Sequence, residues 1–221
     1  MKKVLSGILI GVTVALLGFN FAAQTMDWAQ IREATYGIGD ANEAYCTATK
    51  INETQLLTAG HCVSVGQVLV VWDGKAVVGK AVAVRKNPMS DLALLVIQEG
   101  VKGTYIPVAS QEALQDEEVV LAGYPLGVGE ILTVGHLEGF WYREFTNDVE
   151  SIYFKFNIQT SPGSFGNSGG GSFVYRWGQG WVLVGVTSGV AMQTDFAPYN
   201  HIIYSSSQLE IQKFLADNEG I

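Results

Sequence analysis

Three short segments of the chain hold the residue types needed for nucleophilic hydrolysis. They are residues 57–62 (LTAGHC), 90–94 (SDLAL) and 166–170 (GNSGG). A serine hydroxyl is a poor nucleophile at neutral pH, so it needs a base that takes its proton and a third group that orients this base. We therefore predict that Ser168 is a nucleophile, that His61 acts as general base and then general acid, and that Asp91 fixes the tautomer of His61.

The local context of each residue agrees with these roles. His61 follows a strand-like segment and Gly60, which lets the backbone turn. Asp91 opens an apolar stretch, so its carboxylate should be partly buried and needs a partner such as a histidine N–H. The glycines beside Ser168 permit a tight turn, and we predict that the N–H groups of Gly166 and Ser168 form an oxyanion hole. Taken singly, His61 also fits an incidental histidine at a strand end, Asp91 a strand cap, and the serine segment a simple loop.

Other classes of site and partner fit the chain less well. The serine loop lacks the GxxxxGK[ST] pattern of a phosphate-binding loop. The nucleophile elbow of α/β-hydrolases places its acid and base after the serine, whereas both precede it here. The net charge of −8 and the isoelectric point near 4.8 argue against a nucleic-acid partner.

The N-terminal segment has the composition of an export signal. Lys2 and Lys3 precede an apolar run from Val4 to Phe19, and two alanines close the segment at residue 23. This is the three-part order of a secretory signal peptide. Residues 4–23 are also about long enough to cross a bilayer as a membrane anchor. A cleaved signal peptide and an uncleaved anchor both stay open, and in either case we expect a periplasmic or extracellular protein.

Cys46 and Cys62 are the two cysteines of the chain. In an exported protein such a pair can form a disulfide, which here would close a loop of about 15 residues. Two free buried thiols are an alternative. Metal binding by both cysteines together with His61 is a further alternative, although no CxxC or HxxxH spacing supports it.

After residue 40 the chain reads as many short β-strands. We predict strands at 67–72, 75–84, 91–97, 118–123, 131–138, 151–157, 171–176 and 181–187. Asp73-Gly74 between the first two is a strong hairpin signal. Helical patterns occur at about 27–34 and after Ser207, which begins a capping-box sequence. The pattern predicts an all-β barrel or sandwich, with polar residues 110–117 linking two β-domains.

Taken together, the three catalytic segments resemble the trypsin-like serine peptidases, in the order histidine, aspartate, serine. Further stretches are similar to the HtrA/DegP-type branch of that family. These stretches are 123–127 (GYPLG) with 131–135 (ILTVG), 158–160 (IQT), and Asn167 within the serine loop. The resemblance covers residues 40–205. Its catalytic segments are highly specific for the superfamily, and the HtrA-like stretches are moderately specific.

The resemblance implies two six-stranded antiparallel β-barrels of the chymotrypsin type, a short C-terminal helix and an active site between the barrels. The domains would be a leader at 1–23, a first barrel at 24–109, a linker at 110–117, and a second barrel with the helix at 118–221. His61 and Asp91 would come from the first barrel and Ser168 from the second. The resemblance also implies a Cys46–Cys62 disulfide, and it implies neither a metal nor an organic cofactor.

The chain departs from the family at two places. Trypsin-type zymogens use an aspartate just before the serine to pair with a newly cut N-terminus, and Asn167 carries no charge. We therefore predict no such activation switch. HtrA proteins carry PDZ domains after the protease, whereas this chain ends at Ile221, so the resemblance extends neither to a PDZ domain nor to the trimer typical of those proteins.

The predicted substrate pocket includes Pro162, Ser188 and Gly189. Pro162 lies six residues before the serine, where trypsin has its acidic residue, so we do not expect cleavage after lysine or arginine. We expect a small or medium apolar residue before the scissile bond. The resemblance also implies that Ser188 reaches Asp91.

The function that follows is a serine endopeptidase that cleaves proteins or peptides through an acyl-enzyme intermediate. The alternative is a non-catalytic binding protein on the same fold. A lipase or esterase is opposed by the order of the catalytic segments.

Overall fold

The computed structural model describes residues 27–146, 149–194 and 197–217. The predicted leader at residues 4–23 lies outside these ranges. Within them, no helix is both long and apolar enough to cross a membrane.

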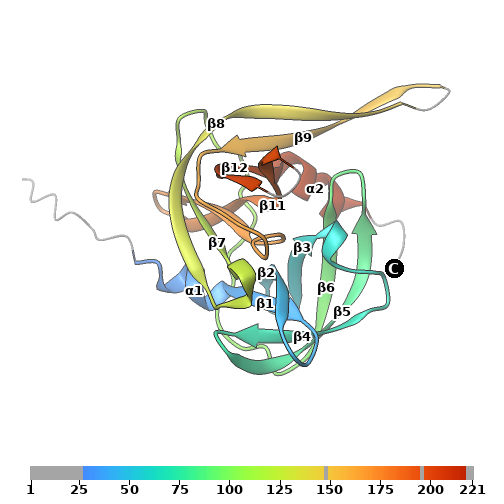
Figure 1. The fold of residues 1–221 in the computed structure, drawn as a ribbon, viewed down its shortest axis with the longest axis vertical. Coiled ribbons are helices and arrows are strands. Elements are labelled where there is room, and N and C mark those ends of the chain that lie inside the picture. The colour runs from blue at the N-terminus through green and yellow to red at the C-terminus, as the bar shows by residue number, and fades with distance from the viewer. Residues whose placement is uncertain (1–26, 147–148, 195–196, 218–221) are drawn as a thin grey trace, which may run out of the picture.

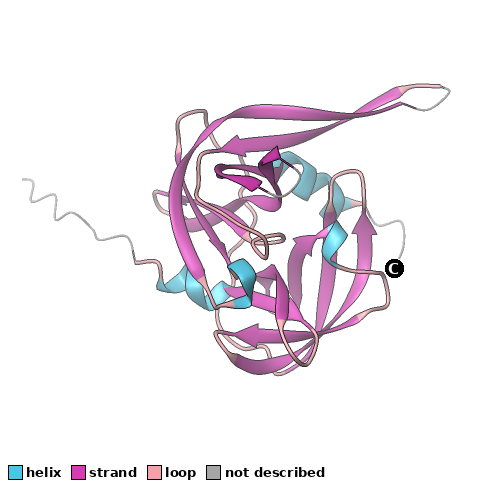
Figure 2. Ribbon diagram, in the orientation of Figure 1, coloured by secondary structure: helices cyan, strands magenta, loops and turns pink. Residues whose placement is uncertain are grey.

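Two closed antiparallel β-barrels of six strands each make up the molecule (Figures 1 and 2). The first barrel has the strand order β1-β2-β3-β6-β5-β4 and the second the order β10-β11-β12-β9-β8-β7. The strands of the first are β1 Thr35–Gly39, β2 Ala44–Asn52, β3 Gln55–Ala59, β4 Val68–Asp73, β5 Ala76–Asn87 and β6 Leu92–Glu99. Those of the second are β7 Glu118–Gly123, β8 Ile131–Thr146, β9 Ser151–Gln159, β10 Gly171–Arg176, β11 Gly180–Thr194 and β12 Ala197–Ser207. The predicted double-barrel fold is confirmed.

Two α-helices and two short 3-10 turns complete the described chain. They are α1 Ala29–Ala34, η1 Gly60–Cys62, η2 Pro125–Gly127 and α2 Gln208–Ala216. The hydroxyl of Ser207 caps α2, because its Oγ accepts a hydrogen bond from the N–H of Glu210 at 3.4 Å. The serine half of the predicted capping box is therefore present, whereas Oε1 of Glu210 accepts from the N–H of Lys155 and from Nζ of Lys213.

One apolar cluster joins both barrels and both helices. It combines Leu57 and Leu92 of the first barrel with Phe173 of the second, and it also contains Ile31 of α1 and Phe214 of α2. Because this continuous core spans the barrel interface, the two halves cannot separate without exposing buried apolar surface. The fold thus holds residues from the two barrels at fixed distances.

Two strands of the second barrel are longer than the sequence predicted. Strand β8 runs to Thr146 rather than to residue 138, and β11 runs to Thr194 rather than to residue 187. The outer half of β8 pairs with β9 as a long hairpin that projects from the barrel (Figure 1). Its side chains alternate between exposed and half-buried positions, so the strand periodicity is present but the segment carries little buried apolar surface.

The predicted disulfide between Cys46 of β2 and Cys62 of η1 is confirmed, with their Cα atoms 6.2 Å apart. Both sulfurs also lie within 4.8 Å of a ring nitrogen of His61. Since the two sulfurs are bonded to each other, neither is a thiolate that could bind a metal. The bridge fixes the 3-10 turn that carries His61 to the neighbouring strand.

We expect reduction of this disulfide to lower the free energy of unfolding by about 3 kcal/mol, since it closes a loop of 16 residues' separation. Urea unfolding with and without a thiol reductant measures the effect. A Cys46→Ala/Cys62→Ala double variant is the control, because its unfolding midpoint should not respond to reductant. An equal midpoint for oxidised and reduced wild type would show that the bridge does not stabilise the fold.

Candidate active site

His61 and Asp91 are held together by two hydrogen bonds. The Nδ1 of His61 lies 2.9 Å from Oδ2 of Asp91, and the backbone N–H of His61 donates to Oδ1 at 2.8 Å. An ionised carboxylate only accepts hydrogen bonds, so Nδ1 carries the ring proton and Nε2 keeps a free lone pair. The His61 side chain is 48% exposed, whereas that of Asp91 is 9% exposed. The pair therefore presents a basic nitrogen toward solvent and a buried carboxylate behind it.

The backbone around Asp91 is shaped to bring its carboxylate to the histidine. Asp91 has φ of 53°, in the left-handed region that residues other than glycine rarely adopt. The N–H of Gly60 donates to its carbonyl at 2.9 Å. A Cβ on Gly60 would lie 3.2 Å from Oδ1 of Asp91. Gly60, which the sequence analysis assigned to a backbone turn, thus also leaves room for this close approach.

Ser188 completes the environment of the carboxylate, as the resemblance implied. Its Oγ donates to Oδ2 of Asp91 at 2.6 Å. Burial raises the pKa of the Asp91 carboxyl, but the hydrogen bonds from His61 and Ser188 and the charge of His61 outweigh it, so the pKa lies below its ordinary value of 3.8. Asp91 is thus an anion throughout the neutral range.

We expect this lowered pKa to make stability fall at acid pH. The ionised carboxylate is favoured in the folded state, so its contribution is complete above the unfolded pKa of about 3.9 and is lost as the pH falls through the folded pKa. Urea unfolding of the wild type and of Asp91→Asn from about pH 6 down to about pH 2 tests this. The difference in unfolding free energy between the wild type and Asp91→Asn should become smaller as the pH falls toward about 2. A difference that stays constant would contradict the assignment.

Ser168 lies between the two barrels, in the loop that joins β9 to β10. Its carbonyl accepts a hydrogen bond from the N–H of Thr47 in β2 at 2.8 Å. The next residue, Gly169, donates to the carbonyl of Thr187 in β11 at 2.8 Å. Thr187 precedes Ser188, the residue bonded to Asp91. A short path of hydrogen bonds therefore connects the serine to the carboxylate through β11.

The same loop also lies beside the turn that carries the histidine. The carbonyl of Ser168 is 3.8 Å from Sγ of Cys62, the residue that follows His61. Within the described residues, no hydrogen bond joins the hydroxyl of Ser168 to His61. Such bonds are often long before substrate binds and tighten in the complex. The structure thus brings the Ser168 loop against the turn that carries His61, while the serine–histidine contact of the triad stays a prediction.

The backbone N–H groups of Gly166 and Ser168 are the ones predicted to form the oxyanion hole. In the described part of the chain, neither Gly166 nor Ser168 donates its N–H to a protein group, although their neighbours Asn167, Gly169 and Gly170 all do. Both residues are half-buried, so these N–H groups are available to an oxyanion of the substrate. The oxyanion hole at Gly166 and Ser168 stays a prediction.

Glycine is required at two positions of the loop. Gly166 has φ of 94° and Gly169 has φ of 85°. A Cβ at Gly166 would lie 2.4 Å from the carbonyl oxygen of Tyr124, and one at Gly169 would lie 2.0 Å from that of Thr47. Any side chain at either position would both strain the backbone and displace the loop.

Thr47 anchors this loop, although it is not among the residues that we predicted for the site. Its Oγ1 donates to the carbonyl of Gly166 at 2.7 Å and accepts from the N–H of Tyr124 at 2.9 Å. Together with its bond to Ser168, these contacts join the serine loop to the first barrel. The one sequence feature that could have pointed to Thr47 is its position beside Cys46. A neighbouring cysteine indicates a structural role rather than a chemical one.

Asn167 is 3% exposed and packs against Gly123. A Cβ added to Gly123 would lie 3.2 Å from the side-chain amide of Asn167. A neutral amide at this buried place has no charge with which to pair an amine. The absence of an activation switch based on a new N-terminus stays a prediction.

A cavity of about 500 Å³ begins next to Ser188. It is lined by Trp141, Arg143, Ile158, Ser188, Gly189 and Tyr204. Two of the three predicted pocket residues, Ser188 and Gly189, thus share one cavity. Pro162 is not among the described residues that line it, and its carbonyl accepts from the hydroxyl of Thr133 at 2.7 Å. A role for Pro162 in substrate binding stays a prediction.

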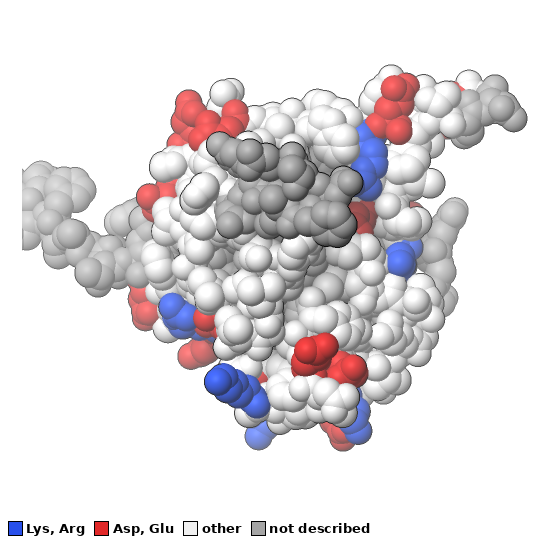
Figure 3. Space-filling model, viewed as in Figure 1, with Lys and Arg blue, Asp and Glu red and all other residues white. Residues whose placement is uncertain are grey.

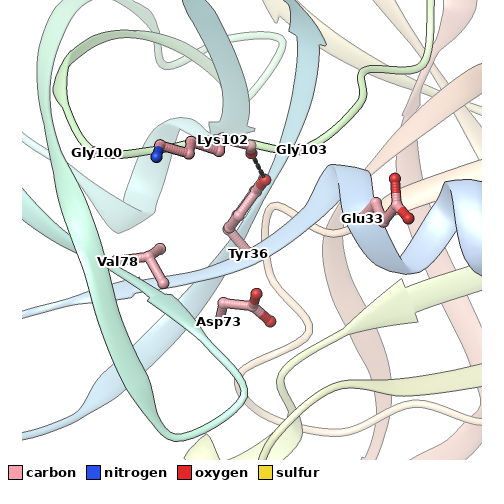
Figure 4. A pocket seen from close by; sticks show the side chains of 7 residues that line it. All are labelled: Glu33, Tyr36, Asp73, Val78, Gly100, Lys102 and Gly103. Carbon is pink, nitrogen blue, oxygen red and sulfur yellow. Dashed lines mark hydrogen bonds between the residues drawn. The ribbon is translucent and has the colours of Figure 1, made fainter.

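A second cavity of about 330 Å³ lies at the surface of the first barrel, beside α1 (Figure 4). The hydroxyl of Tyr36 donates there to the carbonyl of Lys102, and Glu33 and Asp73 lie around it. Burial and the charge of Asp73 raise the pKa of Tyr36 to about 12. A phenol with this pKa stays neutral, and no predicted site residue lines the cavity.

Comparison with known proteins identifies the family and the fold. The family model described as the trypsin-like peptidase domain matches residues 46–186. No curated protein matches the chain. Among solved structures, the Rv3671c protease of M. tuberculosis in its active form is 18% identical with a TM-score of 0.69, covering 86% of this chain and 83% of that one.

Two further structures show the same fold. The MamO protease domain of Magnetospirillum magneticum is 19% identical with a TM-score of 0.65, covering 86% of this chain and 100% of that one. The HtrA-type protease AlgW, solved with a tripeptide, is 18% identical with a TM-score of 0.65, covering 88% of this chain and 64% of that one.

Proposed function

Because this chain belongs to the trypsin-like peptidase family, we propose that it is an exported serine endopeptidase in which Ser168, His61 and Asp91 form the catalytic triad. The observation that carries this proposal is the set of hydrogen bonds around Asp91. The carboxylate accepts from His61 twice and from Ser188, and Ser188 follows the residue bonded to the serine loop. Such an arrangement fixes both the tautomer and the orientation of the imidazole.

The proton moves between two groups of this site. As Oγ of Ser168 attacks the substrate carbonyl carbon, its proton passes to Nε2 of His61, and the N–H groups of Gly166 and Ser168 stabilise the oxyanion. His61 then gives that proton to the leaving amine, the C–N bond breaks and an acyl-enzyme remains. Water attacks the ester with His61 again as base, and the proton returns to Ser168.

Strand β11 offers an edge for the substrate backbone. Strand β10 pairs with it only as far as Val186, and Gly170 bonds with Thr187. On that side, beyond Thr187, the described residues include no further strand partner for Ser188 and Gly189. An extended peptide can pair with such an edge, which brings its scissile bond beside Ser168. The substrate class we propose is therefore an extended or unfolded segment of protein.

Export is supported by the apolar leader pattern and by the disulfide, since disulfides persist in oxidising compartments.

The lysines and arginines on the face drawn in Figure 3 are scattered among acidic groups rather than gathered into one patch. We expect no cleavage after lysine or arginine.

Digestion of an unfolded protein and of a peptide library tests the proposal. We expect amide cleavage by the wild type, and mass spectrometry of the products then gives the residues around each cut. Hydrolysis of simple esters without any peptide cleavage would identify an esterase. Specific peptide binding without turnover would identify a binding protein on this fold.

A further inference from the structure

The cavity beside Ser188 is lined by a cation that, among the described residues, no carboxylate neutralises. Arg143 of β8 has no acidic side chain within ion-pair distance among the described residues, and its guanidinium donates no hydrogen bond to them. The other three arginines all have partners. Arg32 pairs with Glu130, Arg176 pairs with Glu117, and Arg85 donates to the carbonyl of Asp217.

Aromatic rings hold this guanidinium in place. Its central carbon lies 4.7 Å from the ring centre of Phe156 and 5.6 Å from that of Trp141. Stacking fixes the plane of the group and leaves its N–H edges available, in the forked arrangement that matches a carboxylate. Arg143 is therefore oriented without its hydrogen-bonding capacity being used.

The strand register turns the nearest acidic residue away from Arg143. Glu144 follows it in β8, and successive side chains of a strand point to opposite faces. The Glu144 carboxylate accepts from the hydroxyl of Tyr153 at 3.0 Å. Arg143 instead shares its face with Trp141 and with Phe156, which is paired with Trp141 across the hairpin. The positive charge is thus left toward the cavity.

The cavity has room for a side chain because glycine lies at its edge. A Cβ on Gly189 would meet no atom within 4 Å, so this position is open space. Gly189 pairs with Tyr204 of β12, and Tyr204 pairs with Ile158 of β9. The side chains of Ile158 and Tyr204 form apolar walls between the edge of β11 and Arg143.

We propose that this cavity binds an acidic side chain of the substrate, close to the scissile bond. The proposal rests on the proposed peptidase function and names its substrate preference. It replaces the small or medium apolar side chain that the sequence led us to expect in the pocket of Ser188 and Gly189. The methylene stem of a glutamate packs against Ile158 and Tyr204, and its carboxylate pairs with Arg143. A lysine or arginine side chain is disfavoured there, because it would place a second cation beside the first.

Paired peptides that differ only by glutamate or glutamine, at each position around one cleavage site, test this proposal. At one of these positions we expect kcat/KM to be about 10- to 100-fold higher with glutamate, the range of a charge-assisted hydrogen bond. In Arg143→Gln the ratio of kcat/KM for the glutamate peptide to kcat/KM for the glutamine peptide should approach one. In Arg143→Glu a peptide with lysine at that position should be cleaved in preference to the glutamate peptide.

A matched control comes from the same hairpin. Lys155 of β9 lies on the opposite face, pairs with Glu112 at 2.8 Å and does not line the cavity. Lys155→Gln removes the same net charge and should keep the glutamate preference. A wild type without any acidic preference, or a preference that survives Arg143→Gln, would overturn the proposal.

Binding to Ser168→Ala separates this proposal from the triad assignment. Product peptides ending in the residues before the cut should bind this inactive variant more tightly with glutamate than with glutamine, by the same factor. Cleavage without acidic preference would refute only the pocket assignment. Glutamate-dependent binding without cleavage by the wild type would refute only the catalytic one.

Discussion

Replacing Ser168 with alanine is expected to lower kcat/KM for peptide hydrolysis by about 10⁶-fold, the loss typical of removing the nucleophile of a Ser-His-Asp enzyme. The loop should otherwise keep its shape, because its bonds to Thr47 and Thr187 use backbone groups. Cleavage of a quenched fluorescent peptide, followed to long times, measures the residual rate. The urea unfolding midpoint of the variant should stay close to that of the wild type.

Ser164→Ala is the matched control for this loss. Ser164 belongs to the same loop, and its backbone carbonyl accepts a hydrogen bond from the N–H of Asn167 at 3.2 Å. Its hydroxyl has no part in the proposed chemistry, so activity should be retained. Equal losses in both variants would mean that the loop, and not the Ser168 hydroxyl, is what matters.

Replacing Asp91 with asparagine is expected to lower kcat by about 10⁴-fold while changing KM little, as the same change does in other enzymes with this triad. The amide keeps the shape of the carboxylate but loses its charge. Its NH₂ group would donate to Nδ1 of His61, which places the ring proton on Nε2 and removes the base. Steady-state kinetics near neutral pH measures the effect.

Ser188→Ala is a graded companion to that variant. It removes one of the hydrogen bonds to Oδ2 of Asp91 but leaves the charge and both bonds to His61. We expect a loss of about tenfold. An Asp91→Asn enzyme with nearly full activity would exclude the assigned role of Asp91.

The fold was largely predictable because its strands have the period and composition of β-structure. The bounds of β7 and β10 match the predicted 118–123 and 171–176. The outer half of β8 was missed because Phe140 and Tyr142 are exposed, so no buried apolar face marks that segment. Local sequence identifies strands that contribute to a core more readily than strands that project from it.

The site was predictable as a set of residue types but not as a geometry. His61, Asp91 and Ser168 stand in short distinctive segments, and the structure brings these segments together. Thr47 and Arg143 carry no such pattern. Their roles depend on contacts between strands far apart in the chain, which no local sequence signal records.

The central claim is that Ser168 is a nucleophile activated by His61. Labelling with a fluorophosphonate probe tests this most directly, with the adduct located by mass spectrometry of the digested protein. We expect one adduct, on Ser168, formed rapidly in the wild type and lost or greatly slowed in His61→Ala. Absence of labelling in the folded wild type, or an adduct on another serine, would contradict it.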